Sequence, residues 1–139
     1  MTRRGPERQV DDRFWAERLD NARTFRRAAE AISDLAEEGE NAKPIVALIV
    51  LAAVGYGDAL SARVRGVVNR QDHQALPRAV RDALGNRAPE AELNRLRRIL
   101  AEKDAADYGA RYGNLAPARA LLTDLQRLGQ WVEQVLPTL

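Results

Sequence analysis

Apolar residues recur along this chain at the spacing of helix faces, and no stretch alternates apolar and polar residues as a strand does. An unbroken apolar run from Pro44 to Val54 continues into a more basic segment that ends at His73. A helix that is apolar all round its first turns has to be enclosed by other elements. We therefore predict that the fold is organised around this helix.

The remaining apolar patterns predict helices that surround it. The predicted helices are residues 11–39, 44–68, 75–84, 89–108 and 117–136. Proline at the start of three of them suits a first helical turn, where its missing N–H would be unpaired anyway. The buried stripe of the first helix is expected to include Ile32 and Leu35. The sequence thus predicts an all-α fold, an antiparallel bundle of four longer helices plus one short helix, over residues 11–137. Residues 1–10 are expected to be a flexible N-terminus.

The central helix carries a stripe of small residues in its second half. They are spaced alternately three and four apart: Ala52, Gly55, Ala59, Ala62 and Gly66. This spacing places them on one helix face, where the missing side-chain bulk lets another helix approach closely. Trp131 lies off the leucine stripe of the last helix, and interfaces favour tryptophan. We expect a homodimer that buries Trp131 or this small-residue stripe.

Composition excludes several classes of site. The 139 residues hold no cysteine and one histidine, and the net charge is +2. Disulfides and thiolate metal sites are therefore excluded, and no carboxylates cluster at ligand spacing, so we predict no metal and no cofactor. The N-terminus has no apolar segment of the kind that marks a signal peptide. The run from Ile45 to Val54 is shorter than the roughly 20 residues of a membrane span, so we expect a cytoplasmic protein with no membrane contact.

His73 is the candidate for catalysis. An imidazole with a pKa near neutrality can act as acid and base in RNA cleavage. A nearby arginine would hold the phosphate and stabilise its extra charge. His73 with Arg65 or Arg70 could form such a metal-independent site. The alternative is that His73 caps the short helix or hydrogen-bonds a loop carbonyl.

A basic segment is the candidate for binding. From Ala59 to Arg81 five arginines face a single acid, Asp72; they are Arg63, Arg65, Arg70, Arg78 and Arg81. Such an excess could follow a nucleic-acid backbone or a nucleotide phosphate. No aromatic residue is interleaved to stack on bases. The alternative is ion pairing, of Asp58 with Arg65 or of Arg63 with acids on the first helix.

Three further residues are candidates for the binding site. Asp58 is expected to be partly buried, and a buried carboxylate needs a partner, which we place on another helix. Tyr108 and Arg111 could point into a groove between helices. The alternative for the tyrosine is that it closes the end of the bundle, with its ring buried and its hydroxyl in water.

Several of these features together resemble the HEPN superfamily of small helical bundles. They are Asp58-Ala-Leu-Ser-Ala-Arg63 in the apolar helix, His73 in the link after it, Lys103-Asp-Ala-Ala-Asp-Tyr108, and a final helix entered through Pro117. The resemblance covers roughly residues 12–136. It implies a dimerising all-α bundle, often encoded beside a minimal nucleotidyltransferase or in toxin–antitoxin and phage-defence loci. Many members are metal-independent RNases.

The chain departs from the family at its catalytic motif. Catalytic members resemble one another in an arginine followed four to six residues later by histidine, near the start of the last helix. Here that segment, RYGNLAPARA from Arg111, contains no histidine, and neither Arg65 nor Arg70 has that spacing to His73. No residue therefore inherits a catalytic role, and the chain is more similar to the non-RNase branch.

We therefore expect a non-catalytic interaction module. It would dimerise and bind a partner protein, such as a nucleotidyltransferase, or a nucleotide or RNA. Two alternatives remain open: a metal-independent endoribonuclease that uses His73, and a small RNA- or nucleotide-binding bundle without catalysis.

Overall fold

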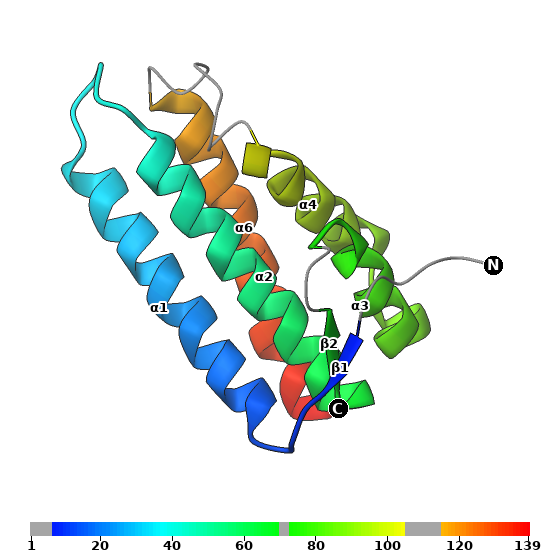
Figure 1. The fold of residues 1–139 in the computed structure, drawn as a ribbon. Coiled ribbons are helices and arrows are strands. Elements are labelled where there is room, and N and C mark those ends of the chain that lie inside the picture. Colours follow the sequence, from blue (N-terminus) through cyan, green and yellow to red (C-terminus); the bar gives the residue numbers. More distant parts are fainter. Residues whose placement is uncertain (1–6, 70–72, 105–114) are drawn as a thin grey trace.

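The computed structural model of this chain describes residues 7–69, 73–104 and 115–139. The helices of the described residues are α1 (Phe14–Leu35), α2 (Lys43–Arg65), α3 (Leu76–Leu84), α4 (Glu90–Ala101) and α6 (Ala116–Val135). Figure 1 shows them as a bundle in which α1 runs antiparallel to α2. The predicted all-α fold is confirmed, and among the described helices α3 is the short one.

Among the described helices, proline begins or precedes each one after α1; the sequence predicts this for α2, α4 and α6 but not for α3. Pro44, Pro77 and Pro117 occupy the first turns of α2, α3 and α6. Pro89 is the extended residue directly before α4, whose first turn contains Glu90 and Glu92. These acids interact favourably with the positive end of the helix dipole.

The apolar helix α2 is the centre of the fold. It contacts each of the other described helices, and every residue from Ala52 to Ala62 is buried. By length and composition α2 could cross a membrane, but 83% of its most apolar window is buried within the bundle, as in the core helix of a folded domain. α1 lies on one side of α2, and α3 and α4 lie on the far side of α2 from α1, whereas α6 packs on α2 between α1 and α4 (Figure 1).

The small-residue stripe of α2 is used inside the chain. A Cβ atom added at Gly55 would lie 3.0 Å from the Cβ of Ala22 and 3.1 Å from the main-chain oxygen of Arg18, both in α1. Glycine allows α1 to approach this closely, because a side chain here would press on the backbone of α1. A homodimer built on the stripe would need α1 to leave this position.

The central helix ends earlier than predicted, because a short β-ribbon follows it. Gly66 adopts a left-handed conformation with φ of 67° and caps α2. The chain then forms β2 (Val67–Asn69), which pairs antiparallel with β1 (Glu7–Gln9). The N–H of Val10 also donates to the oxygen of Gly66 at 2.9 Å. Residues 7–9, which the sequence places in a flexible N-terminus, are thus a strand.

The hydrophobic stripe of α1 differs from the prediction at its C-terminal end. Ile32 is 41% exposed and Leu35 is 82% exposed. The face toward α2 is made by Leu19, Ala22, Ala29 and Ser33. Successive residues of a helix are rotated by about 100° around its axis. The side chains of Ile32 and Ser33 therefore face different directions, and that of Ser33 is the buried one. The expected burial of Ile32 and Leu35 was wrong.

Trp131 is also less exposed than its position off the leucine stripe indicates. Its side chain is half-buried and packs against the core of its own chain. Both surfaces that the sequence offers for a dimer therefore make contacts within the chain.

We predict that Gly55→Val lowers the free energy of unfolding by about 2 kcal/mol or more, because its methyl groups would overlap the α1 backbone. Chemical denaturation measures this loss. As a control, Ala31→Val places the same β-branched side chain at an exposed position of α1, and it should cost only about 0.6 kcal/mol. Equal losses for the two variants would contradict the close approach of α1 and α2 at Gly55.

Candidate functional site

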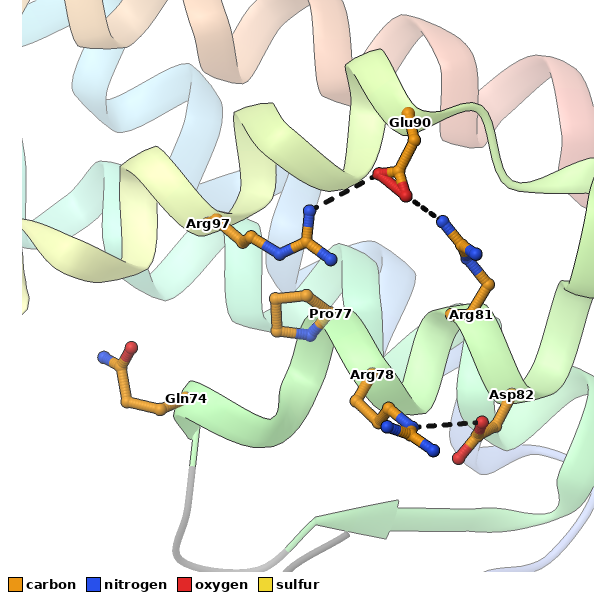
Figure 2. A pocket seen from close by; sticks show the side chains of 7 residues that line it. All are labelled: Gln74, Pro77, Arg78, Arg81, Asp82, Glu90 and Arg97. Atoms are coloured by element: carbon orange, nitrogen blue, oxygen red, sulfur yellow. Dashed lines mark hydrogen bonds and ion pairs between the residues drawn. The ribbon is translucent and has the colours of Figure 1, made fainter. Parts of the chain in front are cut away.

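A cavity of about 680 Å³ lies where α3 packs beside α4. Its lining consists of Gln74, Pro77, Arg78, Arg81, Asp82, Glu90 and Arg97. Figure 2 shows Arg81 from α3 and Arg97 from α4 reaching toward Glu90, whereas Arg78 from α3 reaches toward Asp82. Its size falls within the range of small-molecule sites. The cavity is therefore large enough for a nucleotide-sized ligand.

Each arginine of the cavity is paired with a carboxylate. Arg78 Nε lies 3.5 Å from Asp82 Oδ1, one turn further along α3. Glu90 joins the two helices, because one of its oxygens contacts Arg81 and the other lies 3.5 Å from Arg97 Nη1. Three guanidinium groups against two carboxylates leave one net positive charge in the lining.

The two ion pairs of Glu90 are close to water, whereas Asp82, the partner of Arg78, is only 18% exposed. About half of each arginine side chain is exposed, and Glu90 is more exposed than any of them. Exposed ion pairs of this kind contribute only about 0–1 kcal/mol each. The guanidinium groups are therefore exchangeable donors, which a stronger anion can take from their present partners.

The predicted basic segment divides into two parts. Arg78 and Arg81 line the cavity, as described above. Arg65 instead forms an ion pair of 3.0 Å with Glu7 of β1. Arg63 lies over the ring of Trp15 at 5.8 Å and donates to the main-chain oxygen of Leu139. Neither of the predicted alternatives, an Asp58–Arg65 pair or Arg63 with acids of the first helix, is present among the described contacts.

His73 directly precedes Gln74, a residue of the cavity lining, but His73 is not itself among the described residues that line the cavity. It begins a single 3-10 turn, His73–Ala75, that leads into α3, and its side chain is half-buried. The next residue, Gln74, lines the cavity and donates to the oxygen of Leu100 in α4 at 3.1 Å. This contact ties the link after β2 to α4.

Three predicted site residues, Arg70, Tyr108 and Arg111, lie outside the described residues. The proposed grouping of His73 with Arg70, and the placement of Tyr108 and Arg111 in a groove, therefore remain predictions.

Asp58 has the partner on another helix that its burial requires. The residue is 6% exposed, and its Oδ2 lies 3.1 Å from Nη2 of Arg18 in α1. Its other oxygen, Oδ1, is buried and has no hydrogen-bond partner among the described residues. Burial raises the pKa of Asp58 to about 6, although Arg18 opposes this shift. Asp58 therefore joins α2 to α1, and it is not among the residues that line the α3–α4 cavity.

A second hollow, of about 480 Å³, lies between α1 and α6. Its charged lining residues are Arg26, Arg127 and Glu133. Glu133 also accepts two hydrogen bonds from Arg23, at 2.9 and 2.7 Å, across the two helices. The glutamate is thus committed to holding α6 against α1, and the α3–α4 cavity is the better candidate for a ligand.

Three charged residues of the cavity lining were not among the predicted site residues: Asp82, Glu90 and Arg97. Arg97 is one of three arginines in α4, with Arg95 and Arg98. Arg95 pairs with Glu92, and Arg98 binds Asp124 of α6 at 3.1 Å. Arg97 differs from Arg95 and Arg98 only because the packing of α4 against α3 places it at the cavity. The spacing of arginines along the chain therefore could not predict that Arg97 lines the cavity.

No protein-family model, no curated protein and no solved structure matches this chain. The similarity to HEPN domains therefore rests on the residues quoted for it and remains a prediction. Within residues 7–69, 73–104 and 115–139, no group of three or more histidine, aspartate or glutamate side chains is placed to hold a metal ion.

We predict that Asp58 makes the stability of the protein depend on pH. Its pKa rises from 3.8 to about 6 on folding, so the folded chain binds the proton more tightly than the unfolded chain. The stability that this proton binding adds is fully present below about pH 4 and is lost as the pH rises through about 6. The free energy of unfolding therefore changes by on the order of 3 kcal/mol over this range.

Asp58→Asn removes this titration. Urea unfolding of both proteins between about pH 4 and pH 7 should show the wild type losing stability relative to the variant as the pH rises. The same pH dependence in both proteins would contradict the buried, raised-pKa carboxyl.

Proposed function

We propose that this bundle is a non-catalytic binding module whose α3–α4 cavity takes the phosphate groups of RNA. The observation that carries the proposal is that Arg78, Arg81 and Arg97, from two helices, line one open cavity. Guanidinium groups bind phosphate oxygens in a bidentate way, and such charge-assisted hydrogen bonds are roughly twice as strong as neutral ones.

The pairing of these arginines with carboxylates is compatible with binding. The two pairs of Glu90 are exposed and weak, and a backbone phosphate offers two non-bridging oxygens to guanidinium groups, as a carboxylate does. Internal carboxylates also hold the guanidinium groups in place before the ligand arrives. This reduces the side-chain ordering that binding would otherwise cost.

The lining supports recognition of the backbone and not of the bases. No described lining residue is aromatic, so the cavity lacks the stacking platform that single-strand binders use. Contacts to phosphate position a nucleic acid without carrying sequence information. The proposed binding is therefore tolerant of sequence.

The homodimer and the nucleotidyltransferase-like partner that the resemblance implies remain part of this proposal. The small-residue stripe and Trp131 pack within the chain, so neither supports the dimer. Sedimentation at high micromolar concentration would test it, and a clean monomer would count against it.

Binding to a short single-stranded RNA should weaken as salt is raised. If the three arginines each neutralise one phosphate, the slope of log K against log salt should be about −2. Arg81→Ala and Arg97→Ala should each flatten this slope by about 0.7 and weaken binding to the same extent for different sequences. Fluorescence anisotropy over a salt series measures both quantities.

Arg27→Ala is the matched control, because Arg27 is an exposed arginine of α1, on the far side of α2 from the cavity (Figure 1). It should change neither the affinity nor the slope. Binding that does not vary with salt, or an equal loss in Arg27→Ala, would contradict the proposal.

We also expect RNA to remain intact when it is incubated with the protein in EDTA, and with His73→Ala. The measurement is the length distribution of the RNA on a denaturing gel. Cleavage by the wild type that His73→Ala abolishes would replace the binding module with a metal-independent endoribonuclease.

A further inference from the structure

Glu90 occupies the place between the two helices where a ligand anion would bind. It lies in the first turn of α4, and 61% of its side chain is exposed. Its two oxygens contact different guanidinium groups, Arg81 from α3 and Arg97 from α4, as Figure 2 shows. The carboxylate thus marks a point on which donors from both helices already converge.

Glu90 can leave this point at little cost. Its two ion pairs are exposed, and pairs of this kind contribute only about 0–1 kcal/mol each. In water it would still lie in the first turn of α4, where a negative charge interacts favourably with the helix dipole. Arg97 keeps a second contact, a hydrogen bond of 2.7 Å to Asn94 Oδ1, that holds its guanidinium in place.

The charge that Glu90 leaves behind matches one class of phosphate. With Glu90 turned out, Arg81 and Arg97 present two positive charges at one point. A phosphate monoester carries about −1.5 to −2 near pH 7, whereas each diester of a nucleic-acid backbone carries a single negative charge. The monoester therefore neutralises the pair and has an oxygen for each guanidinium.

We infer that Arg81 and Arg97 form a subsite for a phosphate monoester, such as the 5′ end of an RNA or a nucleoside monophosphate, which displaces Glu90. The inference rests on the proposed function, because it uses the same cavity. It adds that the end of the ligand is recognised in preference to its interior. Arg78, paired separately with Asp82, remains for a neighbouring diester.

The test compares one short RNA with a 5′ phosphate, the same RNA with a 5′ hydroxyl, and a nucleoside 5′-monophosphate as competitor. The wild type should bind the phosphorylated RNA about tenfold tighter than the hydroxyl form. Arg97→Ala should abolish this preference. Glu90→Gln should strengthen binding of the phosphorylated RNA several-fold, because the competing carboxylate is removed. Glu17→Gln, at an exposed acid of α1, should change nothing.

Salt-dependent binding of equal strength to both RNAs would overturn the monoester subsite and leave the proposed function standing. A preference that survives Arg97→Ala would also overturn it. Binding of the nucleoside monophosphate without binding of either RNA would support the subsite and contradict the proposed function. No binding of any ligand would contradict both.

Discussion

The whole fold depends on enclosing one helix. α2 is buried along its length from Ala52 to Ala62, and such an apolar surface is stable only if other helices cover it on every side. α1 covers it closely because Gly55 leaves room for the backbone of α1 next to Ala22. α3, α4 and α6 cover the remaining faces. The position of α3 beside α4, and hence the arginine cavity, is a consequence of this enclosure.

Charged residues have two distinct roles in this bundle. Asp58 with Arg18, and Arg23 with Glu133, link helices that already pack together. At Asp58 the cost of burial is visible in the raised pKa of the carboxyl. Glu90 is different, because it is mostly exposed and is shared by two arginines. It restrains two donors without burying them, which leaves them available to a ligand.

The sequence is sufficient to predict the class of fold and much of the helix placement. Apolar spacing and the prolines at 44, 89 and 117 locate the starts of three helices well, although α4 ends at Ala101, before the predicted end at residue 108. The burial of Asp58 implies its partner on another helix. The β-ribbon is not predictable in this way, because a strand of three residues such as Glu7–Gln9 is too short to show the alternation of apolar and polar residues that marks a strand. Ile32 was misplaced because a broad apolar stripe on α1 does not reveal which edge α2 covers.

Only part of the candidate site could be predicted, because the sequence does not show which helices pack together. Arg78 and Arg81 follow from local charge density, whereas Arg97 and Glu90 join them only through the packing of α4 on α3. The basic segment also suggested too many binding residues, because two of its arginines, Arg63 and Arg65, make contacts inside the chain. Spacing along a sequence shows how charges are distributed on one element but not which elements bring them together.

The most direct test of the account is nuclear magnetic resonance of the arginine side chains during a titration with RNA. The Nε–Hε signals report on each guanidinium separately, so the measurement locates the ligand without relying on affinity. We expect the signals of Arg78, Arg81 and Arg97 to move together and those of Arg23, Arg26 and Arg27 on α1 to stay in place. Movement confined to the α1 arginines, or no movement at all, would contradict a phosphate-binding cavity between α3 and α4.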